Sequence, residues 1–327
     1  MHGVRSLTRY SRFTLAVLAY NILVIVYGAF VRATGSGAGC GSHWPLCNGV
    51  VIPQAPAVET IIEFTHRVSS GGVLILIAIL IIWTWRVYPK GSWVRRGAGF
   101  AALFTVTESL LGAGLVLFNL VAHNASLTRA FSMMLHLVNT FLLLASITIT
   151  ALISIFGEPE KLHPRRDIRW VATAGAVGLL ILGASGAIAA LGDTLFPSGS
   201  LAEGIAQDFI PTAHFLLRLR IFHPIIAVAA GLGSAAALNF IARRSLGATE
   251  KKAGRLLAGL VAVQLVLGAI NVILLAPVWM QLLHLLMTTL IWITYVFGSV
   301  LGLVASYLPV RVGDQEVHNP VNQSPTG

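Results

Sequence analysis

Eight long runs of apolar residues constrain this chain more than any other feature. Each reaches the roughly 20 residues that a helix needs to cross a lipid bilayer. The runs are apolar on all sides and lack the period-two alternation of a membrane β-strand, so we expect helices rather than a barrel. The sequence therefore predicts an all-α integral membrane protein with eight transmembrane helices, at about 13–33, 61–85, 97–120, 131–155, 170–191, 213–241, 256–276 and 280–308.

The composition agrees with this class. The chain is 56% hydrophobic and 10% charged, whereas soluble domains carry about 25% charged residues. We expect the first apolar run to be a retained span rather than a cleaved signal peptide, because it is too long and Tyr27–Arg32 is a poor cleavage site.

The positive charge of the chain is confined to one side of the predicted membrane. The net charge is +10, and 17 of the 22 Lys and Arg residues fall in alternate loops and the two termini. This positive-inside pattern predicts a multi-pass protein of the cell membrane with both termini in the cytoplasm, and anionic lipid rather than nucleic acid as the partner of these charges. The 17 residues are Arg5, Arg9, Arg12, Arg86, Lys90, Arg95, Arg96, Lys161, Arg165, Arg166, Arg169, Arg243, Arg244, Lys251, Lys252, Arg255 and Arg311.

The sequence also repeats itself. Glu108-Ser-Leu-Leu-Gly112-Ala resembles Gln264-Leu-Val-Leu-Gly268-Ala, and His66 precedes Gly112 by 46 positions while His223 precedes Gly268 by 45. Four spans per copy give both copies the same orientation, so we predict two parallel four-helix bundles. The predicted parts are an N-terminal half over 1–156, a cytoplasmic linker over 157–169, a C-terminal half over 170–308 and a disordered cytoplasmic tail over 309–327.

Four histidines lie inside the predicted spans, each five to ten residues below the outer end of its helix. Ionisable or polar groups inside a membrane are costly and usually functional. Two imidazoles on facing helices can hold a haem iron, one on each face. Zinc is the competing metal, but it prefers four ligands, and the second copy offers no acid to match Glu63. The predicted pairs are His66 with His136, and His223 with His284.

Five arginines lie near the outer ends of spans, apart from the cytoplasmic cluster. Haem propionates need cationic partners, and Arg binds carboxylates bidentately. Simple snorkelling of the side chains to the interface is the alternative. The predicted propionate ligands are Arg32, Arg67, Arg129, Arg218 and Arg220.

Glu63, His66 and Arg67 form an E-x-x-H-R motif. Residues three apart share a helix face, so Glu63 is placed beside the candidate iron ligand His66. A carboxyl group there can act as acid, base or stabiliser of a cation, and we take Glu63 and His66 as the candidate catalytic residues. The alternative is a structural Glu bonded to Arg or His. A second acid, Glu108, lies deeper in the third span and has no assigned role.

Both cysteines, Cys40 and Cys47, lie in the first predicted outer loop. Thiols outside the cytoplasm tend to oxidise, which favours a disulfide. Two unlinked thiols or a redox-active pair are the alternatives.

Taken together, these residues resemble the haem A synthase family over nearly the whole chain. The resemblance implies that the N-terminal half binds haem O as substrate at His66 and His136 with Glu63 nearby. It implies that the C-terminal half holds haem b at His223 and His284, and that Cys40 and Cys47 form a disulfide. The segments that carry it are Gly28-Ala-Phe-Val-Arg32-Ala-Thr-Gly35-Ser-Gly37, Cys40-Gly-Ser-His-Trp-Pro-Leu-Cys47-Asn-Gly49 and Glu63-Phe-Thr-His66-Arg67.

The chain departs from the family pattern at three places. Pro224 follows His223 where Arg is common, Glu108 stands where Gln is expected, and the outer loop over 192–212 has no cysteine. Arg218 or Arg220 would then substitute for the missing Arg beside His223.

The resemblance implies oxidation of a methyl group of haem O to the formyl group of haem A. The expected partners are haem O, the upstream haem O synthase and the terminal cytochrome oxidase; a homo-oligomer is left open. Two alternatives are a two-haem transmembrane electron-transfer protein of b type and a haem exporter or chaperone. The electron-transfer protein would place its haems at opposite faces of the membrane, whereas the four histidines lie near one face. The exporter or chaperone would give no reason for an acid such as Glu63 to be present in one copy and absent from the other.

Overall fold

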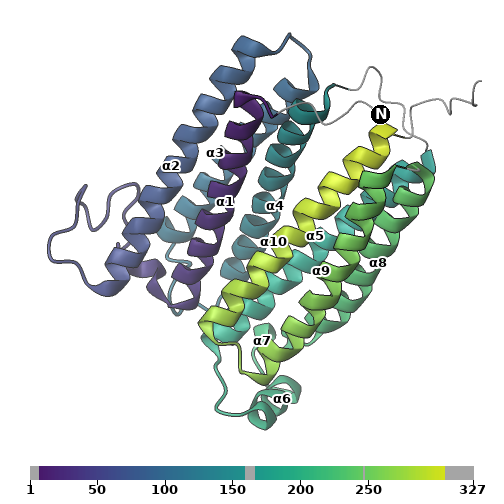
Figure 1. Cartoon of the computed structure of the whole chain (residues 1–327). Helices are drawn as coiled ribbons and strands as arrows, with labels where there is room; N and C mark the ends of the chain where they lie inside the picture. Colours follow the sequence, from purple (N-terminus) through teal and green to yellow (C-terminus); the bar gives the residue numbers. More distant parts are fainter. Residues whose placement is uncertain (1–6, 159–165, 246, 306–327) are drawn as a thin grey trace, which may run out of the picture.

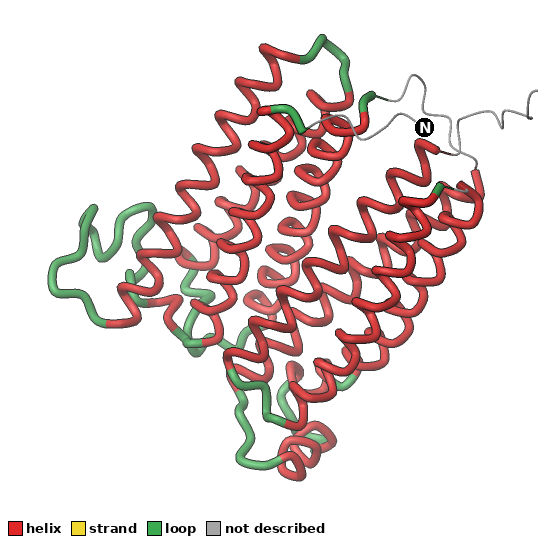
Figure 2. Tube along the Cα trace, in the orientation of Figure 1, coloured by secondary structure: helices red, strands yellow, loops and turns green. Residues whose placement is uncertain are grey.

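The computed structural model describes residues 7–158, 166–245 and 247–305. Regular structure in these ranges is helical, with loops confined to the two ends of the molecule (Figure 2). The helices are α1 (Arg9–Ala33), η1 (Ser36–Ala38), α2 (Val58–Val87), α3 (Trp93–Leu117), α4 (Leu127–Phe156), α5 (Arg166–Leu195), α6 (Leu201–Phe209), α7 (Phe215–Arg220), α8 (Phe222–Ser245), α9 (Ala248–Ile273) and α10 (Val278–Ala305).

Eight of the described helical segments are long and apolar enough to cross a membrane, with α7 and α8 together making the sixth. Their ends lie within about four residues of the predicted ones, except that the seventh span begins eight residues earlier than predicted, at Ala248. The predicted all-α membrane class is confirmed. The predicted linker over 157–169 lies largely outside the described residues, and the tail over 309–327 lies wholly outside them.

The sixth span is interrupted between α7 and α8, which the apolar pattern did not predict. The cause is Pro224, which has no N–H to donate and whose ring clashes with the carbonyl four residues earlier. That residue is Arg220, the last of α7. The break therefore lies in the first half of the span and directly beside His223.

The helices form two groups of four that lie side by side (Figure 1). In one group α1 contacts α2 and α4, and α3 contacts α2 and α4; in the other, α8 contacts α5, α9 and α10, and α10 contacts α5 and α9. Contacts of α10 with α1 and α4, and of α4 with α5, join the groups. The interpretation of these groups as parallel copies of one unit remains a prediction.

Large side chains fill the interface between the two groups. The rings of Phe141 in α4 and Trp292 in α10 stack with centroids 5.4 Å apart, and Trp292 Nε1 donates to the Phe141 carbonyl over 2.7 Å. A Cβ built on Gly183 of α5 would come within 2.8 Å of the Phe141 ring, so this glycine allows the ring to lie against α5. Burial of two aromatic rings at one contact is a strong local stabilisation.

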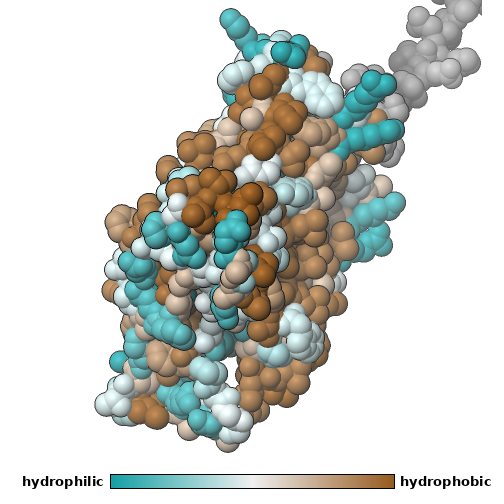
Figure 3. All heavy atoms as spheres, turned by 90° about the vertical axis from the view of Figure 1, so that its left-hand side faces the viewer, coloured by the Kyte–Doolittle hydropathy of each residue, from teal (hydrophilic) through white to brown (hydrophobic). Residues whose placement is uncertain are grey.

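The outer surface fits a lipid environment. Large apolar side chains along the helices are exposed, among them Leu23, Ile75, Ile225 and Val266. The face turned toward the viewer in Figure 3 is largely hydrophobic along the helices, and its hydrophilic side chains gather toward the ends and on the projecting loop. In water this surface would drive aggregation, and in a bilayer it is satisfied by lipid tails.

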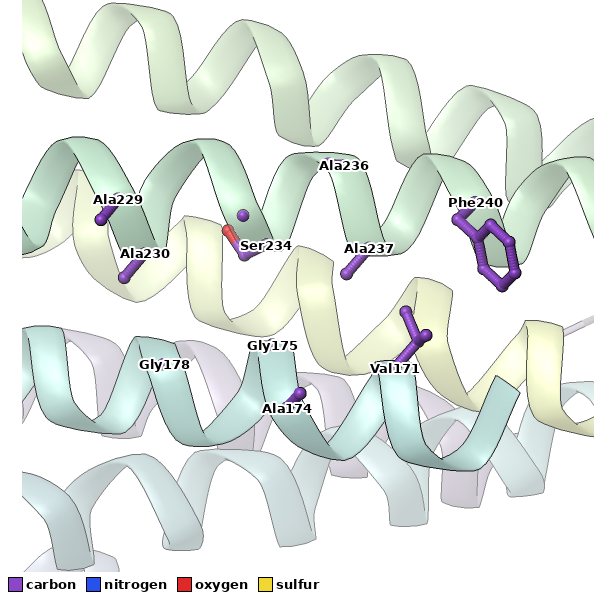
Figure 4. A pocket seen from close by; sticks show the side chains of 11 residues that line it. Val171, Ala174, Gly175, Gly178, Ala229, Ala230, Ser234, Ala236, Ala237 and Phe240 are labelled. Atoms are coloured by element: carbon purple, nitrogen blue, oxygen red, sulfur yellow. The ribbon is translucent and has the colours of Figure 1, made fainter. Parts of the chain in front are cut away.

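The two ends of the bundle differ in their loops. We call the end that carries the loop of Cys40 and Cys47, together with α6, the disulfide end, and the opposite end the basic end. The first residues of α1 and the last residues of α10 both lie at the basic end (Figure 1). A shallow groove of about 550 Å³ between α5 and α8 is lined largely by Gly, Ala and Ser and contains no predicted site residue (Figure 4).

Candidate functional site

The four histidines predicted as ligands lie on α2, α4, α8 and α10, all toward the disulfide end. Each is between six and nine residues from the start of its span. At about 1.5 Å per residue, this is roughly 9–14 Å below the end of the helix. The equal depth on four different helices places two pairs of imidazoles at one level, one pair in each group of helices.

Each of these histidines approaches a glycine on the neighbouring helix. A Cβ on the glycine would come closest to the imidazole Cε1, at distances from 2.9 to 3.8 Å, so a side chain at the tighter positions would displace the ring. The pairs are Gly28 with His66, Gly112 with His136, Gly186 with His223, and Gly268 with His284. The same contact in all four places is the clearest structural sign that the helices of the two groups correspond.

The C-terminal pair has the spacing expected for two ligands of one iron. The ring centroids of His223 and His284 are 6.4 Å apart, with the planes inclined by 71°. Metal–imidazole bonds of about 2 Å on opposite faces of an iron put the two ring centres about 6 Å apart. His223 Nδ1 lies 2.9 Å from the hydroxyl of Ser185, which leaves Nε2 as the nitrogen for a metal. The pair therefore fits a haem iron.

The N-terminal pair has a different environment. His66 packs 6.1 Å from the Tyr27 ring, centroid to centroid, and its Nδ1 is buried without a hydrogen-bond partner among the described residues. His136 Nδ1 lies 3.5 Å from Glu108 Oε1. A carboxyl group beside a candidate iron ligand therefore distinguishes this half from the other.

A second groove, of about 460 Å³, opens between α3 and α4 next to this pair. Its lining includes Leu135, directly before His136, and Thr107, directly before Glu108. The lining is Thr107, Leu110, Leu111, Leu135, Val138, Asn139 and Leu142. The groove can accept an apolar group that continues from the level of His136.

Glu63 is buried and tied to the disulfide loop. Its Oε1 accepts from Arg67 Nη2 at 2.5 Å, and its Oε2 accepts from the backbone N–H of Cys40 at 2.8 Å. Arg67 Nη1 donates to the carbonyls of His43 and Leu46, both at 2.6 Å. A structural Glu63 bonded to Arg was the alternative to a catalytic one, and the contact to Arg67 is of this kind. It holds the Glu63 carboxylate in a fixed orientation. Four of the five guanidinium N–H groups of Arg67 are occupied, which leaves one for a propionate.

The disulfide between Cys40 and Cys47 is present, so the predicted pairing is confirmed. It closes a short loop in which Asn48 N donates to the Cys40 carbonyl over 3.0 Å. The loop, η1 and the start of α2 thus form one unit around Glu63.

Arg32 of α1 bridges the two groups of helices. Its Nη1 donates to the Ala190 carbonyl at 2.7 Å and to the Thr194 hydroxyl at 2.8 Å, and its Nη2 donates to Gln281 Oε1 at 2.9 Å. The first two partners are on α5 and the third is on α10. Arg32 therefore joins α1 to the C-terminal group near the level of the histidines.

Arg129 and Arg220 are also engaged by protein groups. Arg129 Nη1 donates to the carbonyls of Ala122 and Asn124 over 2.6 and 2.7 Å, although its Nε has no partner among the described residues. Arg220 pairs with Asp208 at 2.7 Å and Asp193 at 3.0 Å. Both arginines hold the loops of the disulfide end in place.

Arg218 differs from the other four predicted arginines. It is exposed, and its side chain makes no hydrogen bond or ion pair within the described part of the chain. It lies on α7, directly before the helix break that precedes His223. Of the five arginines, Arg218 is therefore the one with its donors available to an anionic group near the C-terminal pair.

Several contributors to the site were missed from the sequence. Ser185 and Gly186 contact His223, and neither was predicted as part of a site. Gly28 and Gly186 precede their histidines by 38 and 37 positions, so closer attention to spacing would have found Gly186. Within the described ranges, no three His, Cys, Asp or Glu side chains cluster as a metal site.

The fold and these geometric features define a multi-pass helical membrane protein with two pairs of imidazoles inside the membrane. The chain belongs to the cytochrome oxidase assembly protein family (COX15-CtaA), which it matches over residues 11–296.

Curated relatives of this family carry two different names. "Protoheme IX farnesyltransferase" of Thermus thermophilus is 47% identical over 307 residues, covering 94% of this chain and 50% of that protein. "Heme A synthase" of Halalkalibacterium halodurans is 47% identical over 97 residues, covering 30% of this chain and 33% of that protein. "Heme A synthase" of Alkalihalophilus pseudofirmus is 46% identical over 97 residues, covering 30% of this chain and 33% of that protein. The chain thus spans half or less of the length of these relatives.

Proposed function

We propose that this protein is a haem A synthase, a membrane oxidoreductase that converts haem O to haem A by oxidising a porphyrin methyl group to a formyl group. The observation that carries the proposal is the asymmetry between two otherwise matching histidine pairs. The N-terminal pair has a carboxylate contact at 3.5 Å and a buried Glu63 one turn from His66, while the C-terminal half has Gln264 in place of Glu108 and Arg220 in place of Glu63. The family membership and the relatives named heme A synthase support this assignment.

The two halves have separate tasks in this proposal. His66 and His136 hold the iron of the substrate haem O, and His223 and His284 hold haem b. Bound haem b supplies one-electron redox chemistry, which lets electrons leave the substrate site. Arg218 is the propionate ligand favoured for the C-terminal half, because its donors are uncommitted within the described structure.

Glu63 supplies a fixed negative charge on the substrate side. Because Arg67 and the Cys40 N–H hold the carboxylate in place, it suits electrostatic stabilisation of positive charge at the reacting carbon better than shuttling of protons. Two successive two-electron oxidations of the methyl carbon, with water supplying each hydroxyl group and the electrons leaving through the C-terminal haem to an external acceptor, would give a hydrated aldehyde. The hydrated aldehyde would then lose water to leave the formyl group. His66 positions the porphyrin so that its edge faces this charge.

The groove between α3 and α4 supports haem O as the substrate. Haem O differs from haem b by a long isoprenoid tail, which needs an apolar surface continuous with the porphyrin site. The groove lies beside His136 and is lined mainly by Leu and Val. We assign it to the tail.

The supply of haem O points to a partner. The Thermus relative is twice as long as the matched region and is named for farnesyl transfer to protohaem. Haem O is the product of such a transfer, so we propose that haem O synthase delivers the substrate and that the terminal cytochrome oxidase receives haem A. The same proposal places the protein in the cell membrane with its basic end and both termini in the cytoplasm.

The first alternative is a b-type electron-transfer protein. Such a protein needs haems near opposite faces of the membrane, and both histidine pairs here lie toward the disulfide end. A haem exporter or chaperone, the second alternative, has no need for a buried carboxylate in one half.

The deciding experiment is co-expression of the full chain with a haem O synthase, followed by chromatography of the haems extracted from purified protein and membranes. Haem A together with haem b supports the synthase. Haem b alone, at two per chain, would identify an electron-transfer protein instead, and haem O without haem A at normal expression would favour a carrier.

The haem b assignment has its own test. We expect His223→Ala or His284→Ala to remove the low-spin haem b spectrum from purified protein, because no second ligand pair is available in the described part of that half. His123→Ala, an exposed histidine of the disulfide end, is the control. An unchanged bis-histidine spectrum in both ligand variants would contradict the assignment.

A further inference from the structure

Glu108, an acid on α3, lies close to the ring nitrogen of the candidate iron ligand His136 that would point away from the iron. Its Oε1 lies 3.5 Å from His136 Nδ1, and this nitrogen is buried with no hydrogen-bond partner in the described residues. A hydrogen bond of that length is weak, but such contacts often tighten when a ligand is bound. A proton on Nδ1 leaves Nε2 as the metal-binding nitrogen.

Two other polar side chains, Asn139 and Thr140, also contact Glu108. Asn139 Nδ2 donates to Glu108 Oε2 at 2.6 Å and to the Phe104 carbonyl at 2.8 Å. A backbone carbonyl only accepts, so the orientation of the Asn139 amide is fixed. The Thr140 hydroxyl contacts both Glu108 Oε1 and, at 2.9 Å, the His136 carbonyl, and its single proton serves only one of them at a time. Each carboxyl oxygen has two lone pairs, so Glu108 Oε1 has acceptor capacity for the Nδ1–H of His136.

The C-terminal half contains the matched neutral arrangement. Gln264 of α9 donates from Nε2 to the Thr288 hydroxyl at 2.6 Å and to the His284 carbonyl at 3.1 Å. Thr288 follows His284 by four residues, as Thr140 follows His136. The two sites therefore differ by a carboxyl group in one and an amide in the other at equivalent places.

We propose that Glu108 is a positioning residue that holds the His136 ring through its Nδ1–H and lowers the reduction potential of the iron that His136 binds. This inference rests on the proposed function, in which that iron belongs to the substrate haem. A carboxylate on the outer nitrogen makes the imidazole a stronger donor and stabilises the more highly charged ferric state. Because Gln264 gives no such charge, electrons leaving the substrate site move downhill toward the C-terminal haem.

The test is a potentiometric titration of purified full-length protein that carries haem b and has been loaded with added haem A. The formyl group moves the visible band of haem A to longer wavelength than that of haem b, so the two sites are read separately. We expect Glu108→Gln to raise the reduction potential of the haem A site by at least about 59 mV. For one electron this is a tenfold change in the equilibrium constant of reduction. The haem b potential should stay unchanged. Gln is the residue that the other half carries beside its own Thr, so the substitution suits the fold.

Two further variants keep the test independent of one substitution. Glu108→Asp retains the charge and should stay closer to wild type than Glu108→Gln. Gln264→Glu should lower the potential of haem b and leave the haem A site unmoved. Bound haem A with the same potential in wild type and Glu108→Gln would overturn the role of Glu108 alone. Failure of the wild-type chain to bind haem A, or to make it in cells, would overturn the proposed function and this inference with it.

Discussion

Glu63 combines a structural contact and a proposed electrostatic role in one side chain. Arg67 and the backbone of Cys40 occupy both of its oxygens, and only 3% of the residue is exposed. A charge held without room to reorient needs no reorganisation during a reaction, which is the condition under which a fixed charge lowers a barrier most.

We therefore expect Glu63→Gln to bind both haems but to produce little haem A. The substitution keeps the size of the side chain and removes its charge, and losing one preorganised charge commonly slows a reaction roughly 100-fold or more. Haem O or a hydroxylated intermediate should accumulate. Chromatography of extracted haems at equal protein level measures this effect.

The matched control is Glu59→Gln, an exposed acid one turn earlier on α2. It should leave the yield of haem A at the wild-type level. A wild-type yield from Glu63→Gln itself would mean that Glu63 serves only to anchor the disulfide loop.

Individual residues differ in how far the sequence predicts them. Four histidines in apolar runs stand out because polar groups there are costly. The partners of the arginines do not stand out, because most are backbone carbonyls or come from distant segments: Arg32 binds Ala190 and Gln281, 158 and 249 positions away. The prediction that five arginines serve propionates could not anticipate this competition.

At the scale of elements, the close approach of each histidine to a neighbouring helix depends on a glycine. On α5 a Cβ at Gly186 would lie 3.1 Å from His223 Cε1, whereas at Gly178 it would lie 3.7 Å from the Ala230 Cβ. The first distance requires the imidazole of the candidate ligand His223 to shift slightly, and the second is an ordinary van der Waals contact.

We expect Gly186→Ala to lower the haem b content and broaden its low-spin absorption, because the displaced imidazole binds iron less well. Gly178→Ala on the same helix should retain the wild-type spectrum. The ratio of haem to purified protein gives the readout. Equal haem content in the two variants would show that the ring does not need this contact.

The disulfide loop is the second element whose integrity matters. Cys40 and Cys47 are separated by seven positions, and closing so short a ring restricts the unfolded loop by about 2–3 kcal/mol in loop-entropy terms. We expect alkylation without reductant to label neither cysteine in the mature membrane protein. In limited proteolysis, the loop of the double variant Cys40→Ser/Cys47→Ser should be cleaved faster than that of the wild type. The variant should also make less haem A. Two labelled thiols in the unreduced protein would contradict the pairing.

Helix existence was predictable from the apolar runs, but helix interruptions were not. Pro224 in the sequence indicates the break in the sixth span. The break was not predicted because mean hydropathy over a whole span hardly changes with one proline. The short α6 escaped prediction because its nine residues fall below the length at which periodicity is informative.

At the scale of the whole molecule, the predicted orientation can be tested with two single cysteines. Lys90 lies between α2 and α3 at the basic end, and Thr212 lies between α6 and α7 at the disulfide end; both are exposed. In intact cells a membrane-impermeant maleimide should label Thr212→Cys. It should label Lys90→Cys only after permeabilisation. The reverse pattern would invert the proposed topology.

The sequence predicted eight spans and their grouping, but not how the groups meet. Alternation of apolar segments and charged loops determines span number and direction. The interface depends instead on particular partners such as Phe141 and Trp292, which in the sequence look like any other apolar residues of a span. Helix packing in lipid relies on shape and a few hydrogen bonds rather than on hydropathy, so no average over the sequence reveals it.

The distribution of the histidines over separate helices has a consequence for how the protein is made. Neither pair lies on one helix, and the partner of His223 is on α10, the last of the eight described spans. During insertion, the N-terminal pair is complete once α4 has entered the membrane, whereas the C-terminal pair forms only after all eight described spans are in place. On the proposed assignment, haem b can be captured only by a chain whose described spans have all been inserted, so its incorporation marks the end of membrane assembly for this region.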